Sequence, residues 1–192
     1  MKHQLETIEW VQYWAEDCTK EGPRVLMIGD SISVGYRSEV FARVRDTYGC
    51  VTVSTSKALD NPRFCAEIDA LAGFEFEYRA VHFNNGLHGF QLSEEVYGKY
   101  YEKAVDFLAA RWPEARLIIA ASTPVTNAGL NARVLERNRI AKEIADARGL
   151  EWDDLYAAVD GDLSIRTNDP FHFNGKGYAI LADKVAASLL GK

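Results

Sequence analysis

Four short apolar runs recur along the chain, and longer segments with helical spacing separate them. The runs lie at residues 25–28, 50–53, 80–83 and 117–120. Runs of this length and composition predict strands that are buried on both faces of a sheet. A fifth, short strand is expected at 150–155. Between the runs, apolar residues recur three or four positions apart and predict amphipathic helices. They include Tyr97, Tyr100, Tyr101, Ala104, Leu108, Ile140 and Ile144.

The alternation of strands with helices predicts the fold class. Each connection is long enough to be a crossover, and crossovers join parallel strands while their helices cover the faces of the sheet. The expected fold is therefore α/β, a three-layer α/β/α sandwich around a mostly parallel central sheet. No repeat, low-complexity tract or linker-like segment divides the sequence, so a single domain is expected over residues 1–192.

Helical spacing also marks the two ends of the chain. Near the N-terminus the spaced apolar residues are Leu5, Ile8, Val11 and Trp14. They predict an N-terminal helix within residues 1–20 that packs outside the sheet. Near the C-terminus the corresponding residues are Tyr178, Leu181, Ala182, Val185 and Leu189, and they predict a last helix with one apolar face.

Charge and cysteine content exclude several classes of function. With 22 basic and 28 acidic residues the net charge is -6, so the basic surface of a nucleic-acid-binding protein is not expected. Neither a signal-peptide pattern nor a bilayer-spanning apolar stretch is present, so we expect a cytoplasmic protein without a membrane partner. Cys18, Cys50 and Cys65 form no C-x-x-C pair, and no metal or other cofactor is expected. The sequence leaves the oligomeric state open.

Candidate chemistry begins directly after the first apolar run, where the chain reads Gly29-Asp30-Ser31. In an open parallel sheet, ligands bind where the carboxyl ends of the strands meet the loops. A tight turn there would hold Ser31 at the sheet edge and at the start of a helix, with its backbone N–H toward a substrate. A serine hydroxyl becomes a good nucleophile only when a base takes its proton, so a histidine and an orienting carboxylate are required.

The segment before the last helix supplies both groups. In D-P-F-H, Asp169 precedes His172 by three residues, and Pro170 stiffens the turn between them. The carboxylate can then contact one imidazole nitrogen while the other nitrogen faces Ser31. Two structural alternatives remain, because serine is a favoured helix N-cap and a histidine between two phenylalanines can simply be packed. The presence of both motifs in one chain favours the catalytic interpretation.

Together these motifs resemble the SGNH (GDSL-like) hydrolase family over roughly residues 24–190. Members of that family carry the nucleophile in a G-D-S turn after the first strand and a D-x-x-H pair near the C-terminus. The resemblance implies a flavodoxin-like SGNH hydrolase fold and a catalytic triad of Ser31, Asp169 and His172. It also implies a small-molecule ester as the substrate.

Two further signatures of that family, which form the oxyanion hole with the serine N–H, are altered in this chain. The family's glycine after the second strand falls near Leu59, where a backbone N–H can still donate. The family's G-x-N-D is matched by G-L-H-G at 86–89, so His88 takes the place of the asparagine. A neutral imidazole has one N–H to donate, and Asn84 or Asn85 is the alternative donor. The expected oxyanion and substrate-binding residues are therefore Leu59, Asn85 and His88.

The expected activity is hydrolysis of carboxylic esters with short acyl or O-acetyl groups, including those on sugars, through an acyl-serine intermediate. An acyltransferase would use the same triad with an alcohol in place of water. A different class, a non-catalytic ligand-binding module on this fold, is suggested by the two altered signatures. The presence of all three triad residues argues against it.

Overall fold

The computed structural model describes residues 3–19, 21–73 and 76–192. Within these ranges, six strands form one sheet in the order β1-β3-β2-β4-β5-β6. β1 pairs antiparallel with β3, and all other neighbouring strands are parallel. The strands are β1 (Val11–Glu16), β2 (Arg24–Gly29), β3 (Gly49–Thr55), β4 (Tyr78–Phe83), β5 (Arg116–Ala120) and β6 (Glu151–Asp153).

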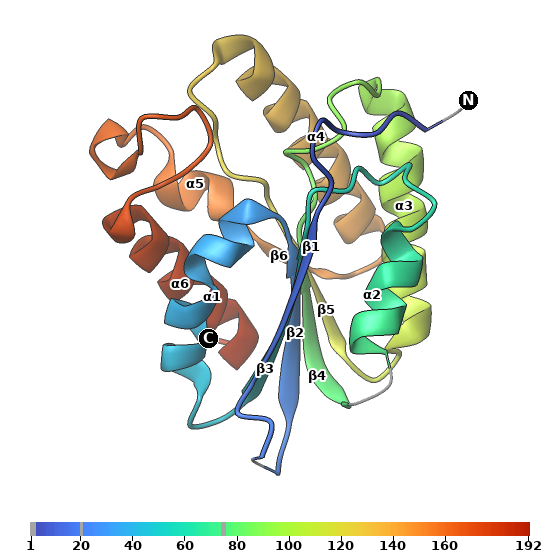
Figure 1. Ribbon diagram of the computed structural model, residues 1–192, viewed down its shortest axis with the longest axis vertical. Coiled ribbons are helices and arrows are strands. Elements are labelled where there is room, and N and C mark those ends of the chain that lie inside the picture. The colour runs from blue at the N-terminus through green and yellow to red at the C-terminus, as the bar shows by residue number, and fades with distance from the viewer. Residues whose placement is uncertain (1–2, 20, 74–75) are drawn as a thin grey trace.

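Helices cover both faces of this sheet. They are α1 (Ser31–Val44), α2 (Phe64–Ala72), α3 (Glu94–Arg111), α4 (Ala128–Ala147), α5 (Leu155–Val159), the 3-10 helix η1 (Leu163–Ile165) and α6 (Gly175–Leu190). α1, α5 and α6 lie on one face, and α2, α3 and α4 lie on the other (Figure 1). None of the helices in the described ranges has the length and apolar character needed to cross a membrane.

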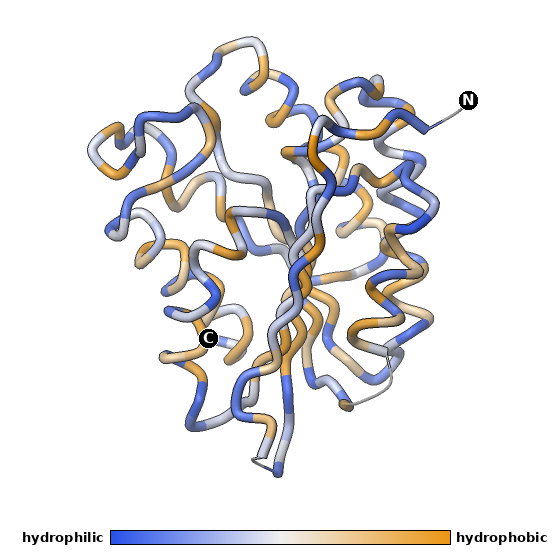
Figure 2. The backbone as a smooth tube through the Cα atoms, viewed as in Figure 1, coloured by the Kyte–Doolittle hydropathy of each residue, from blue (hydrophilic) through white to orange (hydrophobic). Residues whose placement is uncertain are grey.

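Each face of the sheet has its own hydrophobic core. One cluster of buried residues joins the sheet to α1, α5 and α6, and the other joins it to α2, α3 and α4. Hydrophobic residues accordingly concentrate along the strands, while the outer turns of the helices are more hydrophilic (Figure 2). The predicted three-layer sandwich around a mostly parallel sheet is confirmed.

The strands lie where the apolar runs predicted them. The four runs fall inside β2, β3, β4 and β5, and the short strand expected at 150–155 is β6. Every residue of β2 and β3 is buried. Burial on both faces explains why these strands read as continuous apolar runs instead of alternating ones.

The prediction of an N-terminal helix within residues 1–20 is wrong. Residues 1, 2 and 20 of that range lie outside the described residues. The chain runs extended and then forms β1, an antiparallel strand at the edge of the sheet. Trp14 of β1 lies against the guanidinium of Arg37, 3.9 Å from the ring centre. Leu5 and Ile8 are 68% and 73% exposed, so they form no helical packing face. The open edge of β3 offers unpaired N–H and C=O groups, and pairing with them outweighs a weak helical pattern.

Side-chain caps fix where the four longest helices begin. In each case an oxygen of the residue before the helix accepts a backbone N–H of the first turn. The capping residues of α1, α3, α4 and α6 are Asp30, Ser93, Asn127 and Asn174. Three of these helices start from loops at the carboxyl edge of the sheet, and α6 starts from the loop that carries the D-x-x-H motif.

The strand order places a crevice at the carboxyl end of β2. The chain leaves β2 toward β3 on one side, and β4 pairs with β2 on the other. Such a change of direction opens a gap between the loops that leave the two sides, which is where α/β sheets bind ligands. The loops after β2 and β4 are therefore neighbours in space, although more than 50 residues separate them in the sequence.

Candidate active site

Ser31 is the first residue of α1 and follows β2 after a single intervening residue. That residue, Asp30, caps the helix, because its Oδ1 accepts the Ile32 backbone N–H at 2.9 Å. A side chain at Gly29 would bring its Cβ to 2.8 Å from the Ser33 Oγ, so glycine is needed for the turn to close this tightly. The turn therefore presents the Ser31 hydroxyl at the N-terminus of α1, at the carboxyl edge of the sheet.

His172 and Asp169 meet Ser31 from the loop before α6. The Nε2 atom of His172 lies 2.8 Å from the Ser31 Oγ, and its Nδ1 atom lies 2.9 Å from the Asp169 Oδ1. The loop is closed at its base by an antiparallel bridge between Arg166 and Phe173. The structure thus brings the two sequence motifs together in one continuous chain of hydrogen bonds.

The surroundings of Asp169 keep its carboxylate ionised. Burial acts to raise the pKa of Asp169, but the backbone N–H groups of Phe171 and His172, the Thr167 hydroxyl and the His172 ring all donate to it and hold its pKa well below the ordinary value. These backbone donors lie at 2.8 and 2.9 Å from Oδ1. An ionised carboxylate can only accept, so the His172 proton resides on Nδ1 and the Nε2 lone pair is left for the Ser31 hydroxyl.

A pocket of about 320 Å³ opens over this pair of side chains. Ser31 and His172 lie in its wall, and Leu87, Phe90 and Phe171 supply apolar surface. Its remaining lining residues are Glu6, His88 and Gln91. A small concave site with apolar walls and a few polar groups is typical of small-molecule binding. In the described part of the chain, no three His, Cys, Asp or Glu side chains gather in a way that could hold a metal ion.

The three residues expected to bind the oxyanion or substrate are placed differently. His88 lines the pocket together with Ser31 and His172. Leu59 is buried in the core beneath α2 and does not line the pocket. Asn85 also lies outside the lining, because its Nδ2 donates to the Lys57 carbonyl at 3.0 Å and ties the loops after β3 and β4 together. The alternative donor Asn84 is committed as well, with its Nδ2 bound to groups at the end of β5 and in the loop after it.

Sequence reasoning missed Arg137, which holds the His88 loop in place. This residue of α4 is fully buried and donates to the carbonyls of Gly86 (3.0 Å), His88 (2.7 Å) and Gly89 (2.8 Å). Its guanidinium also stacks 4.5 Å from the centre of the Phe90 ring. The available signal was an arginine within the apolar stripe of a predicted helix. Such an arginine is expected to be buried, and a buried arginine needs several acceptors.

Sequence reasoning also missed Glu6 as a residue of the pocket, and no sequence motif indicates its role. Its Oε1 accepts the Gly89 backbone N–H at 2.9 Å and lies 3.6 Å from the Nδ1 of His88. The residue reaches the pocket because the segment before β1 is extended and crosses the loops at the carboxyl edge of the sheet. Because this segment was predicted to be a helix packed outside the sheet, none of its side chains was expected near the pocket.

Comparison with known proteins finds the fold but no close relative in sequence. No protein-family model matches the chain, and no curated protein matches it. A carbohydrate acetylesterase from Sinorhizobium meliloti superposes with a TM-score of 0.74 at 14% identity, over 88% of this chain and 99% of that one. A lipase/acylhydrolase from Enterococcus faecalis gives 0.73 at 16% identity, over 88% and 96% of the two chains.

A third solved structure, a member of the lipolytic G-D-S-L family from Veillonella parvula, gives a TM-score of 0.66 at 19% identity and covers 85% of this chain and 96% of that one. At these identities the likeness is one of fold. The chain therefore has the fold shared by GDSL-type lipases, acylhydrolases and acetylesterases, over most of its length.

Proposed function

We propose that this chain is an SGNH (GDSL-like) serine hydrolase that cleaves carboxylic esters through an acyl-serine intermediate. The observation that carries the proposal is the Ser31–His172–Asp169 chain of hydrogen bonds, with distances of 2.8 and 2.9 Å, in the wall of a pocket. An N-cap serine needs no histidine at its hydroxyl, and a packed histidine needs no ionised carboxylate. The two structural alternatives account for neither contact.

The reaction follows from the positions of these atoms. His172 Nε2 takes the proton of the Ser31 hydroxyl as Oγ bonds to the ester carbonyl carbon, and the carbonyl electron pair moves onto oxygen. The tetrahedral intermediate collapses, the C–O bond to the alcohol breaks, and His172 returns the proton to the leaving alcohol. Water then repeats the sequence on the acyl-serine, which releases the carboxylic acid and restores Ser31. Asp169 stabilises the imidazolium formed in each half.

Two donors are available for the oxyanion. The backbone N–H of Ser31 is at the first position of α1, where N–H groups have no partner within the helix. His88, which lines the same pocket, supplies the second. Each donor in such a site typically accounts for about 3 kcal/mol of barrier lowering.

The size of the pocket favours short acyl groups such as acetyl. A volume of about 320 Å³ is at the small end for ligand sites, and its apolar walls suit an acyl methyl group better than a charged one. One of the similar structures is named a carbohydrate acetylesterase, which agrees with an O-acetyl ester as the substrate class. The same triad would transfer the acyl group to an alcohol if that alcohol displaced water.

Covalent labelling tests the nucleophile directly. A fluorophosphonate probe is expected to modify one serine, and peptide mapping should place the label on Ser31. Ser38→Ala is the matched control, because Ser38 is an exposed serine of the same helix, and it should not affect labelling. A label on any other serine, or undiminished labelling of Ser31→Ala, would rule out the assignment.

Replacing the carboxylate tests the third member of the triad. Asp169→Asn is expected to lower kcat for p-nitrophenyl acetate by roughly 10²- to 10⁴-fold, because an amide cannot fix the imidazole proton on Nδ1 or stabilise its cation. Asp162→Asn is the control. Asp162 is also an exposed carboxylate that caps a turn, through the Ser164 N–H at 2.8 Å, but it does not contact His172. Equal kcat values for the two variants would exclude a role for Asp169.

A further inference from the structure

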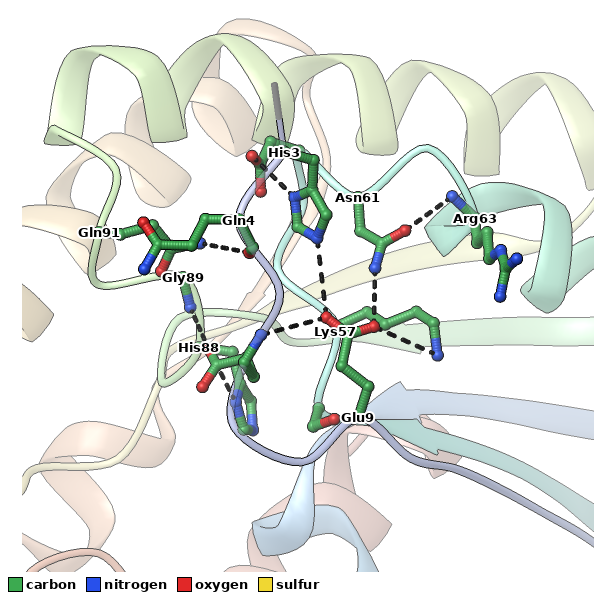
Figure 3. A network of polar contacts seen from close by, with 12 residues as sticks. His3, Gln4, Glu9, Lys57, Asn61, Arg63, His88, Gly89 and Gln91 are labelled. Atoms are coloured by element: carbon green, nitrogen blue, oxygen red, sulfur yellow. Dashed lines mark hydrogen bonds and ion pairs between the residues drawn. The ribbon is translucent and has the colours of Figure 1, made fainter. Parts of the chain in front are cut away.

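The segment before β1 is tied to two loops beside the pocket. Figure 3 shows this segment crossing them, with His3, Gln4 and Glu9 beside residues of the loops after β3 and β4. The contacts are His3 Nδ1 to Asp60 Oδ2 (2.9 Å), Asn61 Nδ2 to Glu9 Oε2 (2.9 Å), Gln91 Nε2 to the Gln4 carbonyl (3.3 Å), and the Trp10 N–H to Ser56 Oγ (2.9 Å). Contacts on both sides of Glu6 fix where its side chain lies.

Glu6 faces the ring of His88. Its Oε1 lies 3.6 Å from the His88 Nδ1 and accepts the backbone N–H of Gly89 at 2.9 Å. Both side chains are mostly shielded, with 30% of Glu6 and 19% of His88 exposed. Among the described residues, the other ring nitrogen of His88 has no hydrogen-bond partner, and the residue lines the pocket that contains Ser31.

The position of the carboxylate restricts the protons on this ring. An ionised carboxylate has no hydrogen to donate, so the Nδ1 that faces it carries one. If His88 is neutral, that is its only N–H, and Nε2 carries a lone pair. A lone pair would repel an oxyanion. His88 can donate from Nε2 only when both nitrogens are protonated, so the neutral donor expected from the sequence does not fit this geometry.

The charges packed around His88 favour its protonated form. Burial lowers the pKa of His88, but the Glu6 contact and the more distant Asp30 raise it above the ordinary value, against the opposing charge of Arg137 on α4. Contact with His88 in turn lowers the pKa of Glu6, despite its partial burial. Burial raises the pKa of Asp30, so Glu6 is the acidic partner with the lower pKa. His172 and Ser31 line the same pocket as His88.

We propose that Glu6 holds His88 as an imidazolium cation, so that a charged N–H faces the oxyanion that forms on the substrate. The proposal rests on the proposed function and makes Glu6 a positioning residue that acts through His88. A cation interacts more strongly with the negative transition state than with the neutral ester, and such a difference accelerates the reaction. The pocket then needs its two histidines in opposite states, with His172 neutral to accept a proton and His88 charged.

The sign of the pH dependence follows. The His88 cation is fully present below the ordinary histidine pKa and is lost as the pH rises through the raised value. Activity should therefore fall on the alkaline side as His88 loses its proton. In Glu6→Gln, which keeps the size and one acceptor oxygen but removes the charge, this alkaline limb should move to lower pH by about one to two units.

The experiment combines ring NMR with kinetics. Histidine ring signals are recorded from about pH 5 to about pH 10 in the full-length protein, with His88→Asn identifying the His88 signal among the four histidines. The kcat/KM for p-nitrophenyl acetate is measured over the same range. We expect the His88 midpoint and the alkaline limb to move together in Glu6→Gln. Glu9→Gln removes a charge from the same segment without contacting His88 and should move neither by more than about half a unit.

Three outcomes would overturn the proposal. The first is a wild-type His88 ring that is neutral at pH 7, and the second is a midpoint that Glu6→Gln leaves unchanged. The third is a His88 midpoint that shifts in Glu6→Gln while the alkaline limb of kcat/KM does not. In that case the Glu6–His88 contact would have no catalytic role. Failure of the proposed function is distinguishable from these, because a wild-type protein without esterase activity would still show the Glu6–His88 coupling by NMR.

Discussion

Ser31→Ala is expected to lower kcat for p-nitrophenyl acetate by about 10⁴-fold or more, the loss typical of removing a serine nucleophile. Without Oγ no acyl-enzyme can form, and the remaining rate would come from substrate binding and the oxyanion donors. The variant should fold normally, because Asp30 and not Ser31 caps α1. Its far-ultraviolet circular dichroism and melting temperature should therefore match those of the wild-type protein.

His172→Ala should cause a similar loss, and the double variant should be no worse than either single one. This non-additivity is expected because a base without its nucleophile, or a nucleophile without its base, has the same residual activity. Steady-state kinetics of the three variants measures it. If the two losses multiplied instead, Ser31 and His172 would be acting in separate steps and not as a unit.

The parallel strands could be predicted because each one has its own signature within a few consecutive residues. A strand buried on both faces has no polar side, so β2, β3, β4 and β5 stand out as apolar runs in the sequence. β1 has no such signature, because it is an edge strand with four partly buried and two exposed residues. Its existence depends on the open edge of β3, about 40 residues further along the chain, and a pattern of residues three apart could not report that edge.

The residues of the candidate site likewise fall into those that the sequence could predict and those that it could not. Gly29-Asp30-Ser31 and the D-x-x-H segment each carry their chemistry within a few residues, so their meeting could be predicted from the fold class. Glu6 and Arg137 act on His88 from 82 and 49 residues away in sequence, and neither belongs to a local motif. Which nitrogen of His88 faces a carboxylate is decided only in three dimensions. The sequence alone therefore gave no basis for proposing a protonation state for that ring.

The loop that carries His88 depends on Arg137 for its conformation. Gly86, His88 and Gly89 turn their carbonyls toward one guanidinium. The Gly89 carbonyl also accepts the Leu92 N–H at 3.0 Å, but without the guanidinium the Gly86 and His88 carbonyls would have no donor among the described residues. Its left-handed residue, Gly89 (φ +71°), brings the backbone so close to the loop after β3 that a Cβ would lie 2.7 Å from that of Ala58. A backbone this constrained needs strong contacts to hold it.

Arg137→Met is therefore expected to lower the free energy of unfolding by about 3 kcal/mol, because methionine fills the space but leaves the Gly86 and His88 carbonyls without a donor and removes one of the two donors to the Gly89 carbonyl. Urea denaturation measures the change. Arg139→Met is the matched control on the same helix: its exposed ion pairs with Glu136 and Glu143 should contribute less than about 1 kcal/mol. Arg137→Lys should recover little of the loss, since one ammonium cannot reach all three acceptors in the geometry of a guanidinium. If Arg137→Met and Arg139→Met were equally stable, the buried guanidinium would not be what fixes the His88 loop.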